Sequence, residues 1–572
     1  MKPFNARGEF HPASEGGGLR RIAVRSAGIT LLGQGASFFL QIGSTMVLAR
    51  LLTPSDFGVV TMVTTFSLLF RSFGLNGFTE LIMQREGISH SLASNLFWID
   101  LGIGTMLTLA FAGSGPLLAL FYHNPAVAQV AEGMSLTIGI GCLGWIHIGL
   151  LQRAMRFRAV AVINAIALLL YVIVAIGLAM AGWHYWALVW AAVTHALATA
   201  TGACCVCRWI PSWPRKASGT GSGFKFAMNV YSHFAFSYIT SNTDNLLVGW
   251  RYGARPLGFY KKAYDLFVLP QSQLLSPLSA VAVSTLSRVS GDRERFRRYF
   301  LQVISVLALL GMGIGADFAL VGKDIIRLLL GPGWEEAGRI FTLFGPGIGV
   351  MLLYNTHGWV HLSIGRPERW LRWSLLEFGC ITSLFLLALR WGPSGVALAW
   401  TVSYFLLMFP GFWYAGKPIG LGVGPVLAVI WKFFAASVGA AFMTVLILRA
   451  VPAFAMRPGP TGALLRMSSA SLLFFGLYFV GVILLHQGPK PLNETARLLR
   501  DLLPENTSRR SSPASFGTEG VSAAPARCGE VKSPSNSVQS PAISNRKHDD
   551  VNTSVGTSSE PDTRATSNKY SS

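Results

Sequence analysis

The stretch Thr243 to Pro270, TDNLLVGWRYGARPLGFYKKAYDLFVLP, decides how the rest of the chain is interpreted. An apolar helix end that contains an acid is followed by a turn built on Gly253 and Pro256. A second helix then begins, and its first turns carry Tyr260, Lys261, Lys262, Tyr264 and Asp265. Charges at membrane depth are costly, so they either face a polar cavity or lie at the membrane interface, where they anchor helix ends. Both placements fit this stretch.

A similar pattern occurs about 200 residues earlier, in Ser44 to Phe70, STMVLARLLTPSDFGVVTMVTTFSLLF. It also has an apolar helix that ends in a basic residue, a short proline turn and a glycine-containing helix start, where proline is well tolerated. A second pair, PLLALFY at 116–122 and DIIRLLLG at 324–331, is separated by nearly the same offset. Two matches at one offset predict an internal repeat, as in transporters. Chance similarity between apolar helices is the alternative.

The composition indicates a membrane protein with many spans. Of the 572 residues, 51% are hydrophobic and only 13% are charged, and the mean hydropathy is +0.47. A soluble domain of this size has a different composition. The net charge of +21 comes largely from short loops between apolar segments, so it predicts topology rather than nucleic-acid binding. The six cysteines form no spaced framework, and the sequence predicts neither a metal site nor a cofactor.

We predict an all-α integral membrane protein with about fourteen transmembrane helices, each of roughly 20 residues. The predicted spans are 27–49, 57–82, 92–121, 127–151, 159–181, 184–207, 226–250, 257–287, 300–322, 338–364, 371–389, 394–415, 425–448 and 466–486. The predicted organisation is a basic N-terminus (1–25), a six-helix lobe (26–210), a linker (211–224), a second six-helix lobe (225–415), two additional helices (416–490) and a disordered tail (491–572).

Lysine and arginine are concentrated in alternate loops, beginning with the N-terminal segment. Because cytoplasmic loops carry the excess of these residues, both termini are predicted to be cytoplasmic. The last external loop, 449–465, has two arginines and departs from this pattern locally. It contains no acid, so it offers no catalytic carboxylate.

The candidate binding residues are cations and tyrosines at interior positions. Arg71 is the first candidate, because it lies well inside the span 57–82 and because the guanidinium fork suits phosphate oxygens. The alternative is that Arg71 snorkels towards the membrane interface or forms a structural pair with Glu80 or Asp100. The other candidate substrate contacts are Arg251, Lys261, Lys262, Tyr260 and Tyr264, with an external interfacial patch as the alternative for the lysines.

Two acids could bind a coupling ion. Asp244 is the main candidate, and Asp265 is the second. A carboxylate inside a membrane is paired, hydrated or protonated, so it either couples transport to an ion or forms a fixed salt bridge. Both interpretations of Asp244 stay open at this point.

Several motifs resemble those of the Wzx-type polysaccharide and lipopolysaccharide O-unit flippases, in the multidrug/oligosaccharidyl-lipid/polysaccharide exporter superfamily. The resemblance is strongest to the colanic-acid and teichuronic-acid exporter branch. It covers roughly residues 26–415, and the motifs are LARLLTPSDFGVVTM (48–62), SFGLNGFTELIMQRE (72–86), NLFWIDLGIG (95–104), LLQRAMRFRAVAVIN (150–164), TDNLLVGWRYGARPLGFYKKAY (243–264) and SIGRPERW (363–370). The Ser/Thr-rich tail departs from the family pattern.

The resemblance implies two pseudo-symmetric lobes around a central cavity and transport by alternating access. The implied substrate is an undecaprenyl-pyrophosphate-linked oligosaccharide repeat unit, moved from the cytoplasmic to the outer leaflet of the bacterial inner membrane for exopolysaccharide or lipopolysaccharide biosynthesis. Membrane lipids and a polysaccharide polymerase/export complex are the implied partners. The alternatives are a membrane-embedded glycosyltransferase, polymerase or ligase acting on the same lipid-linked sugar, and a drug or cation exporter of the same fold.

Overall fold

The computed structural model of the protein describes residues 3–5, 7–10, 35, 37–73, 77–85, 87–214, 220–450 and 459–502. These residues belong to one compact unit, Met1–Leu503. Most of the predicted basic N-terminus and all of the predicted tail after 502 lie outside the described residues. In the described part, regular structure is helical, apart from isolated bridges that pair Phe4 with Phe10 and Glu9 with Ser89.

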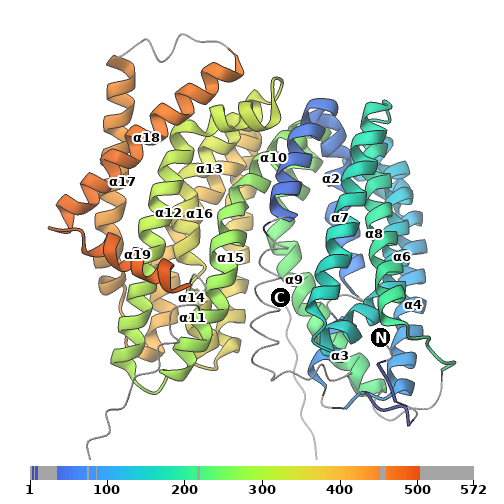
Figure 1. Ribbon diagram of the computed structural model, residues 1–572. Helices are drawn as coiled ribbons and strands as arrows, with labels where there is room; N and C mark the ends of the chain where they lie inside the picture. The colour runs from blue at the N-terminus through green and yellow to red at the C-terminus, as the bar shows by residue number, and fades with distance from the viewer. Residues whose placement is uncertain are drawn as a thin grey trace, which may run out of the picture. The chain divides into compact units, whose positions relative to one another are not determined.

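The first half of the unit begins with the helix Ser37–Leu51. The helices that follow are α2 (Pro54–Phe73), α3 (Thr79–Gln84), α4 (His90–Gly113), α5 (Gly115–Tyr122), α6 (Ala126–Arg153), α7 (Phe157–Met180) and α8 (Tyr185–Cys207). Figure 1 shows these helices in blue to cyan-green. Helix α6 contributes many of the buried residues of this half, because small residues such as Gly144 allow α8 to pack closely against it.

The second half contains the longest helices. They are α9 (Thr220–Tyr252), α10 (Ala254–Pro270), the π-helical turn η2 (Gln271–Leu275), α11 (Ser276–Arg288), α12 (Arg293–Leu330), α13 (Glu335–Tyr354), α14 (His357–Ser363), α15 (Pro367–Ala388), η3 (Leu389–Trp391), α16 (Gly392–Gly416) and η4 (Lys417–Ile419). Asp292 caps the start of helix α12, because its carboxylate accepts hydrogen bonds from the backbone N–H groups of Glu294 and Arg295, both at 3.1 Å.

Nine described helical segments are long and apolar enough to cross a membrane. One of them, Glu368–Ile419, contains two of the predicted spans, so the nine match ten of the fourteen predictions. The other four predicted spans fall on Ser37–Leu51, α2, α9 and the α10–α11 segment. These helices are less apolar or only partly described, so the count of fourteen stays a prediction. Three of the four also supply side chains to the cavity described below.

The break before α2 is built from a local hydrogen-bond pattern. The carboxylate of Asp56 accepts hydrogen bonds from the backbone N–H of Thr53 at 2.9 Å and from its hydroxyl at 2.6 Å. Pro54 occupies the first position of the helix, where a missing N–H costs nothing. The sequence TPSD therefore ends the helix Ser37–Leu51 and starts α2 within three residues.

Helices α2 and α10 cross at very short range (Figure 1), and we call Pro54, Gly58, Ala254 and Gly258 the α2–α10 crossing. A Cβ atom on Gly58 would lie 1.8 Å from the carbonyl oxygen of Ala254. A Cβ atom on Gly258 would lie 1.8 Å from the carbonyl oxygen of Pro54. The contact is reciprocal between two helix starts that the sequence relates by an offset of about 200 residues, as expected for the predicted repeat.

Trp334, just before α13, fills the space beside this crossing. It is only 1% exposed, and its ring packs edge-on against Phe57 at 5.6 Å and Phe259 at 5.8 Å between centroids. Its indole N–H donates a hydrogen bond to the carbonyl oxygen of Ala49 at 2.9 Å. One side chain thus joins the helix Ser37–Leu51 and α2 of the first half to α10 and the start of α13 in the second half.

The chain continues with α17 (Val423–Ala450), α18 (Pro460–Leu485) and α19 (Lys490–Leu502). Helix α18 packs on α12, where Tyr478 donates to the carbonyl oxygen of Leu309 at 2.8 Å and Arg466 pairs with Asp324 at 2.6 Å. The prediction of disorder is wrong for 491–502, because KPLNETARLLRDL has apolar residues at helical spacing and forms the amphipathic helix α19.

Candidate functional site

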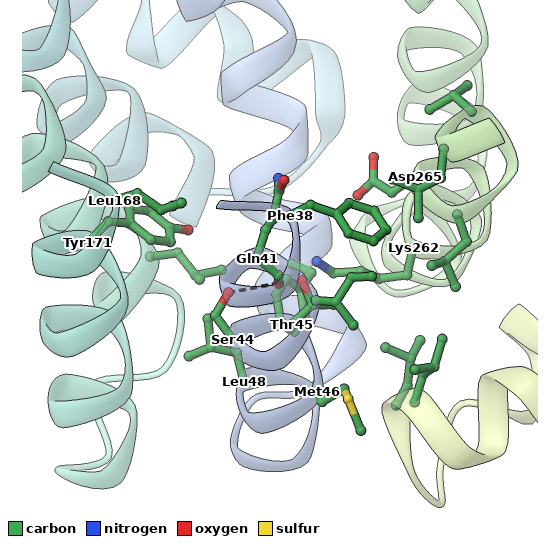
Figure 2. Close-up of a pocket in the computed structure, with 18 of the residues that line it drawn as sticks. Phe38, Gln41, Ser44, Thr45, Met46, Leu48, Leu168, Tyr171, Lys262 and Asp265 are labelled. Carbon is green, nitrogen blue, oxygen red and sulfur yellow. Dashed lines mark hydrogen bonds between the residues drawn. The ribbon is translucent and has the colours of Figure 1, made fainter. Parts of the chain in front are cut away.

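A cavity of about 570 Å³ lies where the two halves of the unit meet. Its wall is formed by the helix Ser37–Leu51, α2, α7, α8, α10, η2 and the end of α12. Figure 2 shows Tyr171 of α7 on one side, Lys262 and Asp265 of α10 on the other, and side chains such as Gln41 and Ser44 between them. Helices from both halves therefore contribute polar groups to one space.

The cavity brings together three residues that the sequence predicted for a site, namely Arg71, Lys262 and Asp265. Arg71 lies near the end of α2, close enough to Tyr238 and His195 for electrostatic interaction. The predicted alternative, a structural pair with an acid, is not what the structure contains. Among the residues that it describes, Arg71 forms no ion pair, the Asp100 carboxylate has no hydrogen-bond partner, and Glu80 accepts from Gln84.

The two neighbouring lysines of α10 have different environments. Lys261 donates to the carboxylate of Asp265 at 2.7 Å, one helical turn further on. The Lys262 ammonium instead lies 4.1 Å from the centre of the Phe57 ring and forms no ion pair within the described chain. A cation over an aromatic ring gains only about 0.5 to 2 kcal/mol, less than a charge-assisted hydrogen bond provides. Lys262 thus contacts an aromatic ring and interacts with Asp265 only over a longer range than Lys261 does.

Asp244 is fully buried and is held by three donors. One carboxylate oxygen accepts the backbone N–H of Asn245 at 2.7 Å. The other accepts the Tyr260 hydroxyl at 2.7 Å and the Trp400 indole N–H at 2.9 Å. This carboxylate joins α9, α10 and α16, and no salt bridge to it is found among the described residues, which disfavours the fixed salt bridge considered from the sequence.

Other predicted site residues lie outside the cavity wall. Arg251 is exposed at the end of α9, with its guanidinium 5.7 Å from the centre of the Tyr252 ring. Tyr260 is fully buried, and its ring stacks on Tyr264 at 6.1 Å between centroids. Tyr264 in turn packs against Trp400 at 6.1 Å. The two tyrosines, predicted as substrate contacts, belong here to the packing that surrounds Asp244.

Several cavity residues were not singled out from the sequence. Tyr171 and His195 lie on α7 and α8 with their rings 6.4 Å apart, and both line the cavity. Trp400 was also missed, because it lies 156 residues from Asp244 along the chain and only the fold brings them together. No local motif marks these positions. The polar residues of the helix Ser37–Leu51, by contrast, interrupt an apolar run and could have been noticed.

The arrangement is suited to binding an anion rather than to covalent chemistry. Arg71 supplies a planar set of donors and Lys262 a point charge, the two cations that proteins use most for phosphate. Polar side chains of the helix Ser37–Leu51 and of η2, including Gln41, Thr45 and Gln273, supply further donors and acceptors. Within the described residues, no group of three or more His, Cys, Asp or Glu side chains could hold a metal ion.

The fold and the cavity define a helical membrane transporter built from two repeated halves. The chain belongs to the polysaccharide biosynthesis protein family, whose sequence model matches residues 47–339. That range includes α2, the α2–α10 crossing, Arg71 and Lys262. The family therefore covers both halves of the cavity wall.

Characterised relatives share little sequence identity with this chain but align with more than half of it. The chain is 23% identical over 357 residues to the succinoglycan biosynthesis transport protein ExoT of Rhizobium meliloti, covering 62% of this chain and 72% of that protein. It is 21% identical over 303 residues to the lipopolysaccharide biosynthesis protein WzxC of Escherichia coli, covering 52% and 61%. It is 23% identical over 380 residues to the teichuronic acid biosynthesis protein TuaB of Bacillus subtilis, covering 63% and 75%.

Solved structures confirm the transporter fold. The lipid II flippase MurJ in an inward closed conformation has a TM-score of 0.65 at 14% identity and covers 80% of this chain and 98% of its own. An inward-facing multidrug resistance MATE family transporter of the MOP superfamily has a TM-score of 0.55 at 13% identity, covering 67% and 94%. At these identities the likeness concerns the fold alone.

Proposed function

We propose that the protein is a flippase that moves an undecaprenyl-pyrophosphate-linked oligosaccharide repeat unit from the cytoplasmic to the outer leaflet by alternating access. The product would serve exopolysaccharide or lipopolysaccharide biosynthesis. The observation that carries the proposal is the cavity between the halves, with Arg71 and Lys262 in its wall and neither in an ion pair within the described residues. The names of the relatives, which concern polysaccharide biosynthesis and transport, support it.

The chemistry of the cavity fits such a head group. A sugar pyrophosphate is anionic and strongly hydrated, so it crosses a hydrocarbon core only if fixed cations and polar groups replace water. A volume of about 570 Å³ is within the range of ligand-binding cavities. We propose that Arg71 and Lys262 contact the pyrophosphate. Lys261, Tyr260 and Tyr264 would support these contacts from positions behind the cavity wall. Arg251 would contribute only at the outer end of the path.

A membrane-embedded glycosyltransferase, polymerase or ligase is the alternative function. Such an enzyme needs acidic or basic catalytic groups next to its sugar substrate, often on a large external loop. The loop 449–465 contains no acid, and the relatives with informative names include a transport protein. A transporter without catalytic residues therefore accounts best for the site. A drug or cation exporter fits poorly, because cations in the wall repel a cationic cargo.

Replacement of Arg71 tests the binding role. Arg71→Ala should abolish polysaccharide export while the protein still inserts at normal levels. Arg71→Lys should restore export only in part, because it keeps the charge but loses the two-pronged guanidinium. Export is measured as extracellular polysaccharide and protein level by immunoblot of membranes. Arg298→Ala, an exposed arginine at the start of α12, is the matched control and should export normally. Full export by Arg71→Ala would remove Arg71 from the site.

We also propose that Asp244 binds a coupling ion, with Asp265 as a second acid nearer the cavity. The three donors around Asp244 connect three helices, so a change in its charge would alter contacts between α9, α10 and α16. An ion can bias one conformation only through its different affinity for the two states. Because Asp244 has no partner base among the described residues, its neutralisation would strand no opposite charge.

Asp244→Asn is expected to leave substrate binding and protein level largely intact and to stop net turnover. The amide keeps the shape and one acceptor oxygen but loses the charge. Export and membrane protein level are measured together. Asp292→Asn is the control, since asparagine caps a helix as well as aspartate does. Normal export by a well-expressed Asp244→Asn variant would contradict the coupling role.

The proposed location is the bacterial inner membrane, with both termini cytoplasmic and a polysaccharide polymerase/export complex as a partner. Helix α12, with 38 residues and a length of roughly 57 Å, connects the loop at Ser290 to the loop at Gly333 across the membrane. A topology reporter fused after Ser290 should report a cytoplasmic position, and one after Gly333 a periplasmic position. The reverse pair of signals would overturn the orientation.

A further inference from the structure

The side chain of Phe57 belongs both to the cavity wall and to the contacts around Trp334. Its side chain lines the cavity, where the Lys262 ammonium lies 4.1 Å from the centre of its ring. The same ring packs edge-on against Trp334 at 5.6 Å between centroids. Phe57 is only 6% exposed, so its ring is confined between the cavity and the contacts around Trp334.

The contacts of Trp334 hold the two halves of the unit together. Its indole N–H donates to Ala49, which precedes α2, and its ring also contacts Phe259 of α10. Phe57 directly precedes Gly58, whose backbone lies against the carbonyl oxygen of Ala254 in the α2–α10 crossing. Packed interfaces shift between discrete arrangements rather than deform smoothly. Movement of Phe57 would therefore change the packing at the α2–α10 crossing.

Lys262 is the group that an anion would displace. Lys261 is already bound to Asp265 at 2.7 Å, whereas Lys262 contacts the face of Phe57 and interacts with Asp265 only over a longer range. A phosphate oxygen offers a full negative charge and a hydrogen bond, and it therefore competes well against a ring face. Arg71 in the same cavity would hold the remaining oxygens.

We propose that Phe57 is a positioning residue that transmits anion binding in the cavity to the α2–α10 crossing. When the anion draws Lys262 away from the ring, Phe57 loses one of its two restraining contacts, its packing on Trp334 loosens, and the crossing separates more easily. The inference rests on the proposed function in one respect, namely that the cations of the cavity bind a phosphate-containing head group. It adds a route by which cargo opens the contact between the halves.

A cysteine at the crossing reports its separation. Ala254 is 8% exposed, so Ala254→Cys should react slowly with a charged maleimide while the crossing is closed. The six native cysteines are replaced, and the full-length protein is studied in lipid nanodiscs with inorganic pyrophosphate as the anion probe. Pyrophosphate should raise the labelling rate roughly threefold to tenfold, the change expected from the loss of one cation–π contact. Calorimetry measures pyrophosphate binding in the same samples.

Two variants separate the role of Phe57 from general packing. Phe57→Leu should still bind pyrophosphate but lose the pyrophosphate-dependent change in labelling. Lys262→Met, which keeps the apolar stem, should label faster than the parent even without pyrophosphate, because the ring has lost its cation. Phe442→Leu is the control, because Phe442 is an exposed phenylalanine of α17 that lies outside the cavity wall. It should keep both binding and response.

Each outcome has a distinct meaning. If the parent protein binds pyrophosphate but its labelling rate does not change, the transmission is overturned while the proposed function stands. If Phe57→Leu keeps the full response, or if Lys262→Met labels at the parent rate without pyrophosphate, Phe57 does not transmit binding. If the parent fails to bind pyrophosphate at all, the anion site of the proposed function is contradicted, and the inference falls with it.

Discussion

Two cations that form no direct ion pair with any described residue of a helical membrane protein are the feature on which the account depends. A charge at membrane depth must be hydrated or matched by an opposite charge. Arg71 and Lys262 have no ion-pair partner among the described residues, although several acids lie in the same unit. Asp265 is bound to Lys261, and Asp244 is bound to neutral donors. We propose that the positive charge of the cavity binds an anionic cargo that arrives from outside the protein.

The cavity and the contact between the halves are built from the same short segments. The starts of α2 and α10 form the reciprocal glycine crossing. Phe57 lies within this crossing on α2, and Lys262 lies one turn after Gly258 on α10. Trp334 closes this arrangement from the second half. The repeated helix starts therefore form the contact between the two halves. In a transporter of two halves, this is the contact that opens and closes during alternating access.

The sequence predicted the helical membrane fold and the repeat, because composition, charge density and proline–glycine turns are local signals. The role of the 243–270 stretch stays a prediction. It also predicted three residues that the cavity brings together. It could not place Trp400 beside Asp244 or Trp334 beside Phe57, since these contacts join segments far apart in the chain. The tyrosines of α10 were assigned to the substrate because a ring and a hydroxyl suit sugars. Tyr260 is instead buried and bonded to Asp244, and the half-buried Tyr264 packs against Tyr260 and Trp400. The number of spans was hardest to predict, because the helix Ser37–Leu51, α2 and the α10–α11 segment supply polar side chains to the cavity and are less apolar or only partly described.

The central claim is that the protein moves a lipid-linked sugar between leaflets and does not build or polymerise it. The most direct measurement is deletion of the gene, followed by identification of the accumulated lipid-linked sugar and of the leaflet in which it lies. The account predicts a complete repeat unit on its pyrophosphate lipid, inaccessible to reagents from the outer face until the intact gene is restored. Accumulation of the same complete unit in the outer leaflet, or of an incomplete sugar chain, would contradict it.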